Sequence, residues 1–168
     1  MKIEKILKII AFIFGIVYAC FILNIIMSLI ISVCFNKYDN YKDISKYVNK
    51  NYNYLEEKAK KCINDNKISC SKITKGYPIV IKKITVLKKD EERRNTIVEF
   101  MTAGRGLVPS STYIGFYYSE DDVPASFQNG TEELKQIEKN EWEWIGNGDN
   151  HGKTTKIRKK WYYFEASF

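Results

Sequence analysis

The longest uncharged stretch of the chain runs from Ile9 to Phe35 and constrains the fold more than any other feature. One asparagine and two serines are its only strongly polar residues. As a helix these 27 residues would extend roughly 40 Å at ~1.5 Å per residue, whereas a bilayer core is about 30 Å thick. The sequence therefore predicts one transmembrane anchor over residues 9–35, preceded by a short basic tail over residues 1–8.

The sequence disfavours three other interpretations of this stretch. A cleaved signal peptide has an apolar stretch of about 7–15 residues, and this one is about twice too long. A lipoprotein would be cleaved before Cys20, but bulky Tyr18 beside that position and the apolar residues beyond it argue against cleavage. A buried core helix is disfavoured, because the rest of the chain is too small to enclose a helix that is apolar on all sides.

The lysines around the stretch leave its orientation open. Three precede it, which suits a cytoplasmic N-terminus, but four more follow it closely. Long domains are translocated largely regardless of charge, and Cys62 and Cys70, the only thiols outside the stretch, are compatible with one disulfide. We therefore expect a single-pass cell-membrane protein with an extracytoplasmic C-terminal domain. The alternative is a cytosolic domain with two reduced cysteines.

Residues 36–168 are predicted to form one α+β domain. Apolar residues recur at spacings of three and four from Asp39 to about Asn64, which indicates an amphipathic helix. Five strands are predicted over about residues 79–87, 95–102, 111–118, 141–145 and 153–168, with a short helix over Thr131–Asn140. Consecutive strands with short links favour an antiparallel sheet of about five strands, with the amphipathic helix packed on one face.

Motifs that would indicate metal binding or catalysis are weak. His151 is the only histidine, so a zinc site would lack ligands, and a serine hydrolase would have a base without a Gly-x-Ser-x-Gly nucleophile motif. The Gly-rich segment from Asn147 to Gly152 lacks the oxygen ligands of an EF-hand and is interpreted as a hairpin turn. Arg105 lies between two glycines and could help to hold an anion. We expect neither a metal nor a cofactor.

Carboxylates are abundant, so a hydrolase that uses only carboxylates is the alternative function. The available acids include Glu99, Glu120, Asp121, Asp122, Glu141, Glu143 and Glu165. The sequence does not select a pair among them, and we lean towards a protein that is not an enzyme. Residues 36–168 carry a formal charge of +5, once the three lysines and one glutamate before Ile9 are left out of the whole-chain +7. For an anchored domain this charge does not by itself indicate nucleic acid, which we do not expect as a partner.

Aromatic side chains carry the functional hypothesis. They lie on several predicted strands and point to both faces, and one face of a small sheet cannot bury them all. We predict a membrane-anchored binding module that recognises a protein, a peptide or an envelope ligand without catalysis, with the lipid bilayer as its other partner. An immunity-type protective membrane protein is a variant of this hypothesis. The candidate ligand-binding residues are Arg105, Tyr117, Trp142, Trp144, Trp161 and Tyr163.

Overall fold

The computed structural model describes residues 12–27, 39–65, 79–91, 93, 95–107 and 110–168. The chain divides into two compact units, Met1–Lys37 and Tyr38–Phe168, and each is described by itself.

The first unit contains a helix over residues 12–27, whose side chains are exposed. Among the helices described, none is long and apolar enough to cross a membrane. This finding contradicts the predicted transmembrane anchor over residues 9–35 and the single-pass cell-membrane location that rested on it. The rest of that stretch, and the tail over residues 1–8, lie outside the described residues.

The second unit begins with two helices, α2 (Tyr41–Lys50) and α3 (Tyr52–Asn64). The Asn40 side chain caps α2 by accepting the backbone N–H of Asp43 at 3.0 Å. Asn51 separates the two helices, and both its side-chain amide and its backbone N–H donate to the carbonyl of Tyr47. The sequence predicted one continuous helix here, because the apolar spacing passes through Asn51 without interruption.

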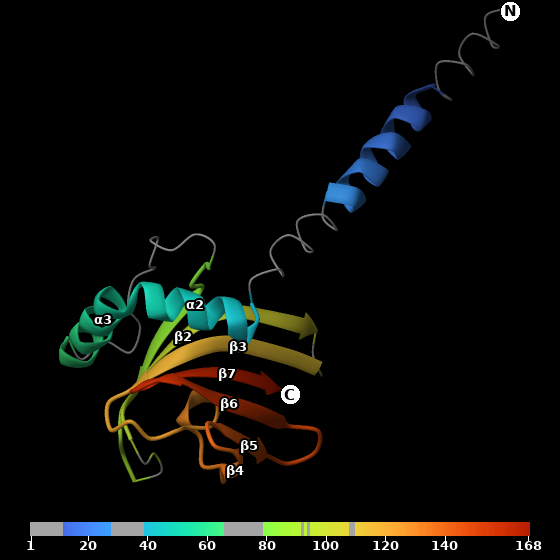
Figure 1. Ribbon diagram of the computed structural model, residues 1–168. Coiled ribbons are helices and arrows are strands. Elements are labelled where there is room, and N and C mark those ends of the chain that lie inside the picture. Colours follow the sequence, from blue (N-terminus) through green and yellow to red (C-terminus); the bar gives the residue numbers. More distant parts are fainter. Residues whose placement is uncertain (1–11, 28–38, 66–78, 92, 94, 108–109) are drawn as a thin grey trace, which may run out of the picture. The chain divides into compact units, whose positions relative to one another are not determined.

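Seven antiparallel strands form one sheet in the order β1-β2-β3-β7-β6-β5-β4. They are β1 (Lys83–Leu87), β2 (Ile97–Leu107), β3 (Ser110–Ser119), β4 (Lys135–Glu138), β5 (Glu141–Ile145), β6 (His151–Arg158) and β7 (Trp161–Ser167). Both helices lie on one side of the sheet (Figure 1), with α2 packed over β6 and β7 and α3 over β2. The α+β class with an antiparallel sheet is confirmed, whereas the prediction of about five strands is wrong.

The two additional strands come from segments whose local sequence is misleading. The predicted helix over Thr131–Asn140 contains β4, which pairs with β5 through a register shift between Gln136 and Glu138. The predicted long strand over residues 153–168 is the hairpin of β6 and β7, turned at Lys159 and Lys160, the latter at a φ of 67°. Pairing with neighbouring strands, rather than local propensity, determines both segments.

Both faces of the sheet carry a core. On the face that bears α2 and α3, here called the helix-side face, Phe100 and Phe116 stack with their centroids 4.9 Å apart. On the opposite face, here called the far face, Tyr117 and Tyr162 stack at 5.1 Å under the segment that contains Ala125. Most of the aromatic side chains are therefore divided between two cores.

Candidate functional site

A hollow on the helix-side face crosses the C-terminal strands β5, β6 and β7. In the sheet register Glu143 is opposite Lys153, and Lys153 is opposite Glu165. The next row places His151 between Ile145 and Ser167. Alternate residues of a strand share a face, and Tyr163, two residues before Glu165, contacts Tyr41 of α2. The two rows therefore lie on the helix-side face.

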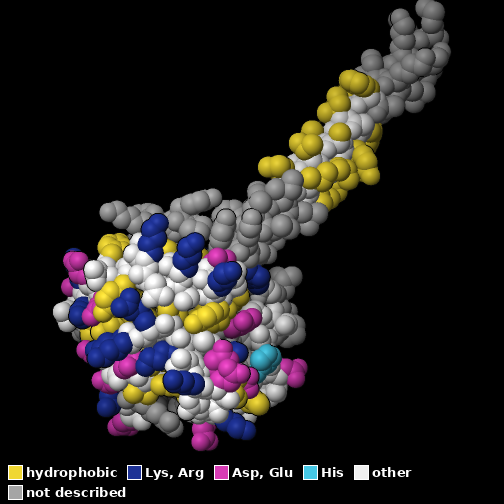
Figure 2. All heavy atoms as spheres, viewed as in Figure 1, with side chains coloured by type: hydrophobic (Ala, Val, Ile, Leu, Met, Phe, Trp, Pro, Cys, Tyr) yellow, Lys and Arg dark blue, Asp and Glu magenta, His cyan; other side chains and the backbone are white. Residues whose placement is uncertain are grey.

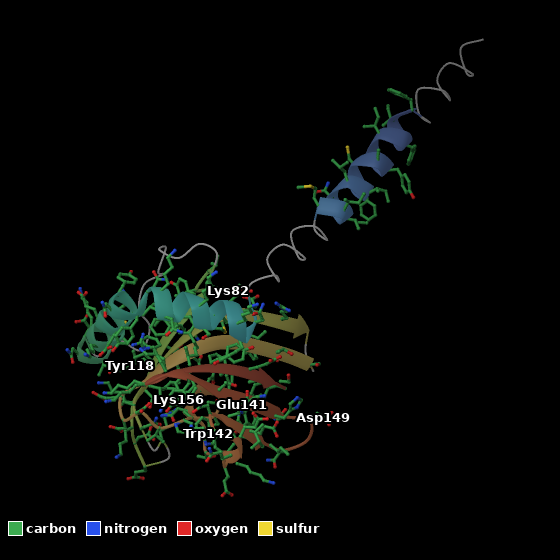
Figure 3. All side chains as sticks on the ribbon, in the orientation of Figure 1. Lys82, Tyr118, Glu141, Trp142, Asp149 and Lys156 are labelled. Carbon is green, nitrogen blue, oxygen red and sulfur yellow. The ribbon has the colours of Figure 1, made fainter. Side chains whose placement is uncertain are left out.

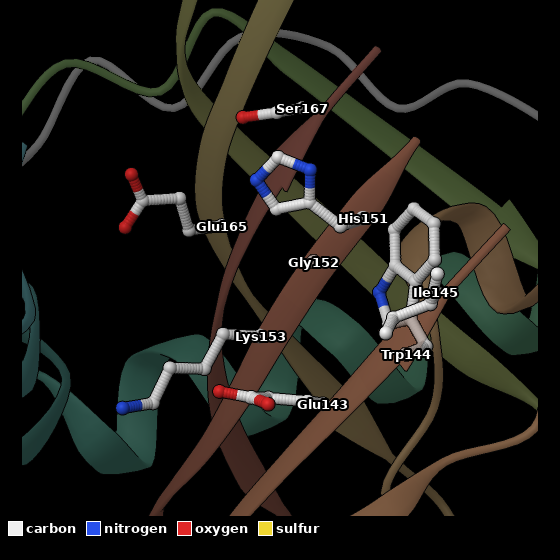
Figure 4. Close-up of a pocket in the computed structure, with 8 residues that line it drawn as sticks. All are labelled: Glu143, Trp144, Ile145, His151, Gly152, Lys153, Glu165 and Ser167. Carbon is white, nitrogen blue, oxygen red and sulfur yellow. The ribbon is translucent and has the colours of Figure 1, made fainter. Parts of the chain in front are cut away.

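This acidic hollow has a volume of about 400 Å³. Its lining residues are Glu143, Trp144, Ile145, His151, Gly152, Lys153, Glu165 and Ser167, shown in Figure 4. Asp and Glu side chains also gather beside the single histidine on the surface in Figure 2. Two nearby residues, Glu141 on β5 and Asp149 in the turn between β5 and β6, are labelled in Figure 3.

Negative charge exceeds positive charge in this hollow. Lys153 Nζ lies 2.6 Å from a carboxylate oxygen of Glu141. That hydrogen bond, with the charges of Glu141, Glu143 and Glu138, raises the pKa of Lys153 above its ordinary value, although burial opposes the shift. Glu165 on β7 is opposite Lys153 on β6. Lys153 is the one lysine or arginine among the described lining residues, so the carboxylates around it are only partly neutralised.

The orientation of His151 is fixed by a local hydrogen bond. Its Nδ1 atom lies 2.7 Å from the backbone carbonyl of Asp149, and a carbonyl can only accept, so Nδ1 carries the proton. In the neutral ring Nε2 then has a free lone pair. The side chain is exposed, and its ring lies between Ser167 and Ile145 in Figure 4.

The packing of Trp144 on the far face depends on Gly152. A Cβ atom at this position would lie 2.5 Å from the indole of Trp144, a distance that real contacts do not reach. The missing side chain lets the indole lie flat against β6, where Trp144 is 3% exposed. The glycine of the predicted hairpin turn thus forms part of β6, while Gly148, at a φ of 67°, forms the turn itself.

Arg105 lies on the same face as the hollow. In the register it is opposite Thr112, and Thr112 is opposite Ser167, so it occupies the row of His151. Its guanidinium forms an ion pair with Asp39 at 2.9 Å. The segment 103–106, predicted as a link between strands, therefore belongs to β2 and holds Arg105 at the start of α2.

The aromatic residues that the sequence singled out do not form one surface. Tyr117 and Trp144 are buried on the far face, and Trp161 and Tyr163 are buried on the helix-side face. Trp142 is half-buried and meets the ring of Tyr162 edge-on at 6.1 Å. Trp144 also lines the acidic hollow, whereas the others contribute mainly to packing.

Most of the other acids have structural roles or lie apart. Asp122, at a φ of 57°, accepts hydrogen bonds from Lys156 Nζ, the Lys160 backbone N–H and the Tyr162 hydroxyl. Glu99 is buried on the far face, where it accepts the backbone N–H of Gln128 at 3.3 Å. Burial raises the pKa of Glu99 to about 7, although this hydrogen bond and the charge of Lys83 oppose the shift. Glu120 and Asp121 are exposed.

No group of three potential metal ligands occurs among the described residues. Cys62 is buried in α3 and is disulfide-bonded. Cys70 lies outside the described residues, so the pairing of Cys62 with Cys70 stays a prediction.

Sequence reasoning named Glu143 and Glu165 but could not connect them, and it missed Lys153 and Ser167. The alternation in Glu141–Ile145 indicates which side chains of β5 share a face. The residues opposite them on β6 and β7 follow only from the β6–β7 hairpin, and the sequence predicts this hairpin as one strand.

No protein-family model, no curated protein and no solved structure matches this chain.

Proposed function

We propose that this protein is a binding module that holds a lysine or arginine side chain of a partner protein in the acidic hollow, without catalysis. The observation that carries the proposal is the arrangement of Glu143 and Glu165 on either side of Lys153, whose own charge is engaged by Glu141. A cationic side chain would complete the charge balance and form charge-assisted hydrogen bonds with these carboxylates.

Other groups of the hollow suit such a ligand. The Nε2 atom of His151 offers an acceptor, since Nδ1 is bound to Asp149. Ile145 is 81% exposed at the rim, so it can cover the aliphatic stem of a bound lysine or arginine. Across β5, a shallow hollow that includes Ile137, which is 40% exposed, continues this apolar rim. Together these groups would recognise a cationic head and its apolar stem.

Hydrolysis by a carboxylate pair is the weaker alternative. Such a mechanism needs one acid that keeps its proton near neutral pH. Among the described acids Glu99 has a raised pKa, but it lies on the far face and is 4% exposed. It is therefore separated by the sheet from Glu143 and Glu165.

The test measures binding of an arginine-containing pentapeptide, and of its glutamate-containing counterpart, to the full chain by NMR. We expect the arginine peptide to shift the amide signals of Gly152 and Ser167. The double variant Glu143→Gln/Glu165→Gln should bind it about tenfold or more weakly, since hydrogen bonds to charged groups contribute about 1.5–3 kcal/mol. Glu120→Gln removes one exposed acid elsewhere and serves as the control.

Binding of both peptides alike would contradict the proposal, as would equal affinity of the double variant and the native chain. Raising the salt concentration should weaken binding of the arginine peptide, because the hollow is open and its charges are screened.

A further inference from the structure

A second hollow, of about 350 Å³, lies where α2 ends and α3 begins, against the end of β6. It shares no lining residue with the acidic hollow. Its described lining consists of three asparagines, two tyrosines, Lys50 and Arg158, and includes no carboxylate. We call it the Arg158 hollow.

Tyr52 holds Arg158 in place. The guanidinium carbon lies 3.6 Å from the centre of the Tyr52 ring, a distance typical of two stacked planes in contact. Stacking occupies the face of the guanidinium and leaves its N–H groups, which lie in its plane, available to an acceptor. Within the described part of the chain, Arg158 has no ion-pair or hydrogen-bond acceptor. The guanidinium is thus oriented by Tyr52 but has no acceptor among the described residues.

The positive charge of this hollow is not neutralised by neighbouring acids. Glu56, the acid that hydrogen-bonds to Tyr52, also pairs with Lys60 at 2.6 Å. These bonds to Lys60 and Tyr52 lower the pKa of Glu56, although burial opposes the shift. Lys50 has no ion pair among the described residues, and Lys159 follows Arg158 in the turn between β6 and β7. An anion entering the hollow would meet two cations and amide side chains.

We propose that the Arg158 hollow binds the phosphate group of a small phosphate monoester. At pH 7 such a group carries a charge of about −1.5 to −2, which matches Lys50 and Arg158 together, whereas a carboxylate carries a single negative charge. The planar guanidinium presents paired N–H donors to two phosphate oxygens. The volume lies within the ~300–1,000 Å³ range of small-molecule sites, so it accommodates more than the phosphate itself. Tyr54, which also lines the hollow, offers an aromatic surface to the rest of the ligand.

The experiment titrates the full chain with phenyl phosphate, inorganic phosphate and benzoate by isothermal calorimetry at constant ionic strength. We expect phenyl phosphate to bind most tightly, and more tightly at pH 8 than at pH 5, because its phosphate gains its second charge near pH 6. Arg158→Gln should weaken binding about tenfold or more, and Lys50→Gln by a smaller factor. Arg158→Lys keeps the charge but loses the paired donors, so its affinity should also fall.

Lys42→Gln is the matched control, since it removes an exposed lysine of α2 that does not line the hollow. Lys50 is exposed as well, so Lys50→Gln tests the site without a risk to folding. An equal loss in Lys42→Gln would show general charge attraction and overturn the site. If inorganic phosphate bound as tightly as phenyl phosphate, the proposal that the ligand is a monoester would be overturned. If benzoate bound as tightly as phenyl phosphate, the proposed preference for a phosphate group would be overturned. The arginine-peptide test of the acidic hollow is independent of every one of these outcomes.

Discussion

At the residue scale, Glu99 opposes the stability of the fold at neutral pH. It is buried on the far face, where, among the described residues, the backbone N–H of Gln128 is the one hydrogen-bond donor to its carboxylate. Its pKa is about 7, against about 4.3 in an unfolded chain. Between these values the folded protein holds a proton that the unfolded chain releases, so this residue lowers stability as pH rises from about 4 to about 7.

We therefore predict that Glu99→Gln removes a pH dependence. The stability of the variant relative to the native chain should rise by roughly 3 kcal/mol between pH 4.5 and pH 8, because one pKa unit corresponds to about 1.4 kcal/mol. Urea unfolding across this range measures the difference. Glu120→Gln, at an exposed acid, is the control and should give a flat difference. If the free energies of unfolding of Glu99→Gln and the native chain changed in parallel with pH, Glu99 would not be the cause of the pH dependence.

At the element scale, Asp122 fixes the hairpin of β6 and β7 from outside it. Its carboxylate accepts the Lys160 backbone N–H at 2.6 Å and Lys156 Nζ at 2.9 Å, and its carbonyl accepts the Tyr162 hydroxyl at 2.7 Å. These hydrogen bonds connect the start of the segment that covers the far face to the β6–β7 hairpin. Burial alone would raise the pKa of Asp122, but the hydrogen bonds to its carboxylate lower it.

We predict that Asp122→Asn destabilises the fold by about 1–2 kcal/mol at pH 7, since it removes hydrogen bonds to a charged group at a partly exposed site. Asparagine tolerates the positive φ of this position, so the change reports on the charge. The difference should diminish as pH falls below about 4, because a carboxylate with a lowered pKa loses its contribution when it is protonated. Thermal unfolding at pH 7 and pH 3 measures both effects, and an undiminished difference at pH 3 would show that the carboxylate charge is not the cause of the loss.

The same hairpin shows what the sequence could predict about elements. Alternation and β-branched residues identified the approximate positions of β2, β3 and β5, because these strands are half-buried and carry their own pattern. The turn at Lys159 and Lys160 has neither glycine nor proline, so no local signal divides β6 from β7. In β4 every residue is exposed, so it carries no burial pattern, and the acids after Thr131 favour a helix start instead. Its strand conformation is set by pairing with β5.

At the scale of the whole molecule, the candidate site was harder to predict than the fold class. Counting aromatic side chains on both faces led to the hypothesis of an exposed binding surface. The segment around Ala125 instead covers the far face, so that Tyr117 and Phe164 become a second core. Chain length alone does not reveal which loop folds back over a sheet. The acidic hollow depends on the register of three strands, β5, β6 and β7. Lys153, which lies between Glu143 and Glu165, belongs to no recognisable sequence motif.

The distribution of buried residues leads to a prediction about the two units. All the buried core residues described, from Ile44 to Ala166, belong to the second unit. A fragment of residues 38–168, prepared under non-reducing conditions to keep the disulfide of Cys62, should therefore fold alone. Its unfolding midpoint should lie within about 2 °C of the full chain, because a loss of 1 kcal/mol would shift it by several degrees.

A second fragment, residues 52–168, provides the contrast. It lacks α2 and with it Ile44, Tyr47 and Val48, all of which are 5% exposed or less. Removing these side chains uncovers the helix-side core over β6 and β7, so we expect this fragment to unfold or to melt at least 10 °C lower, a loss of roughly 2 kcal/mol or more. Circular dichroism on heating distinguishes the two. If residues 38–168 melted as poorly as residues 52–168, the first unit would be required for the fold, and the division of the chain at Lys37 would not be a boundary of stability.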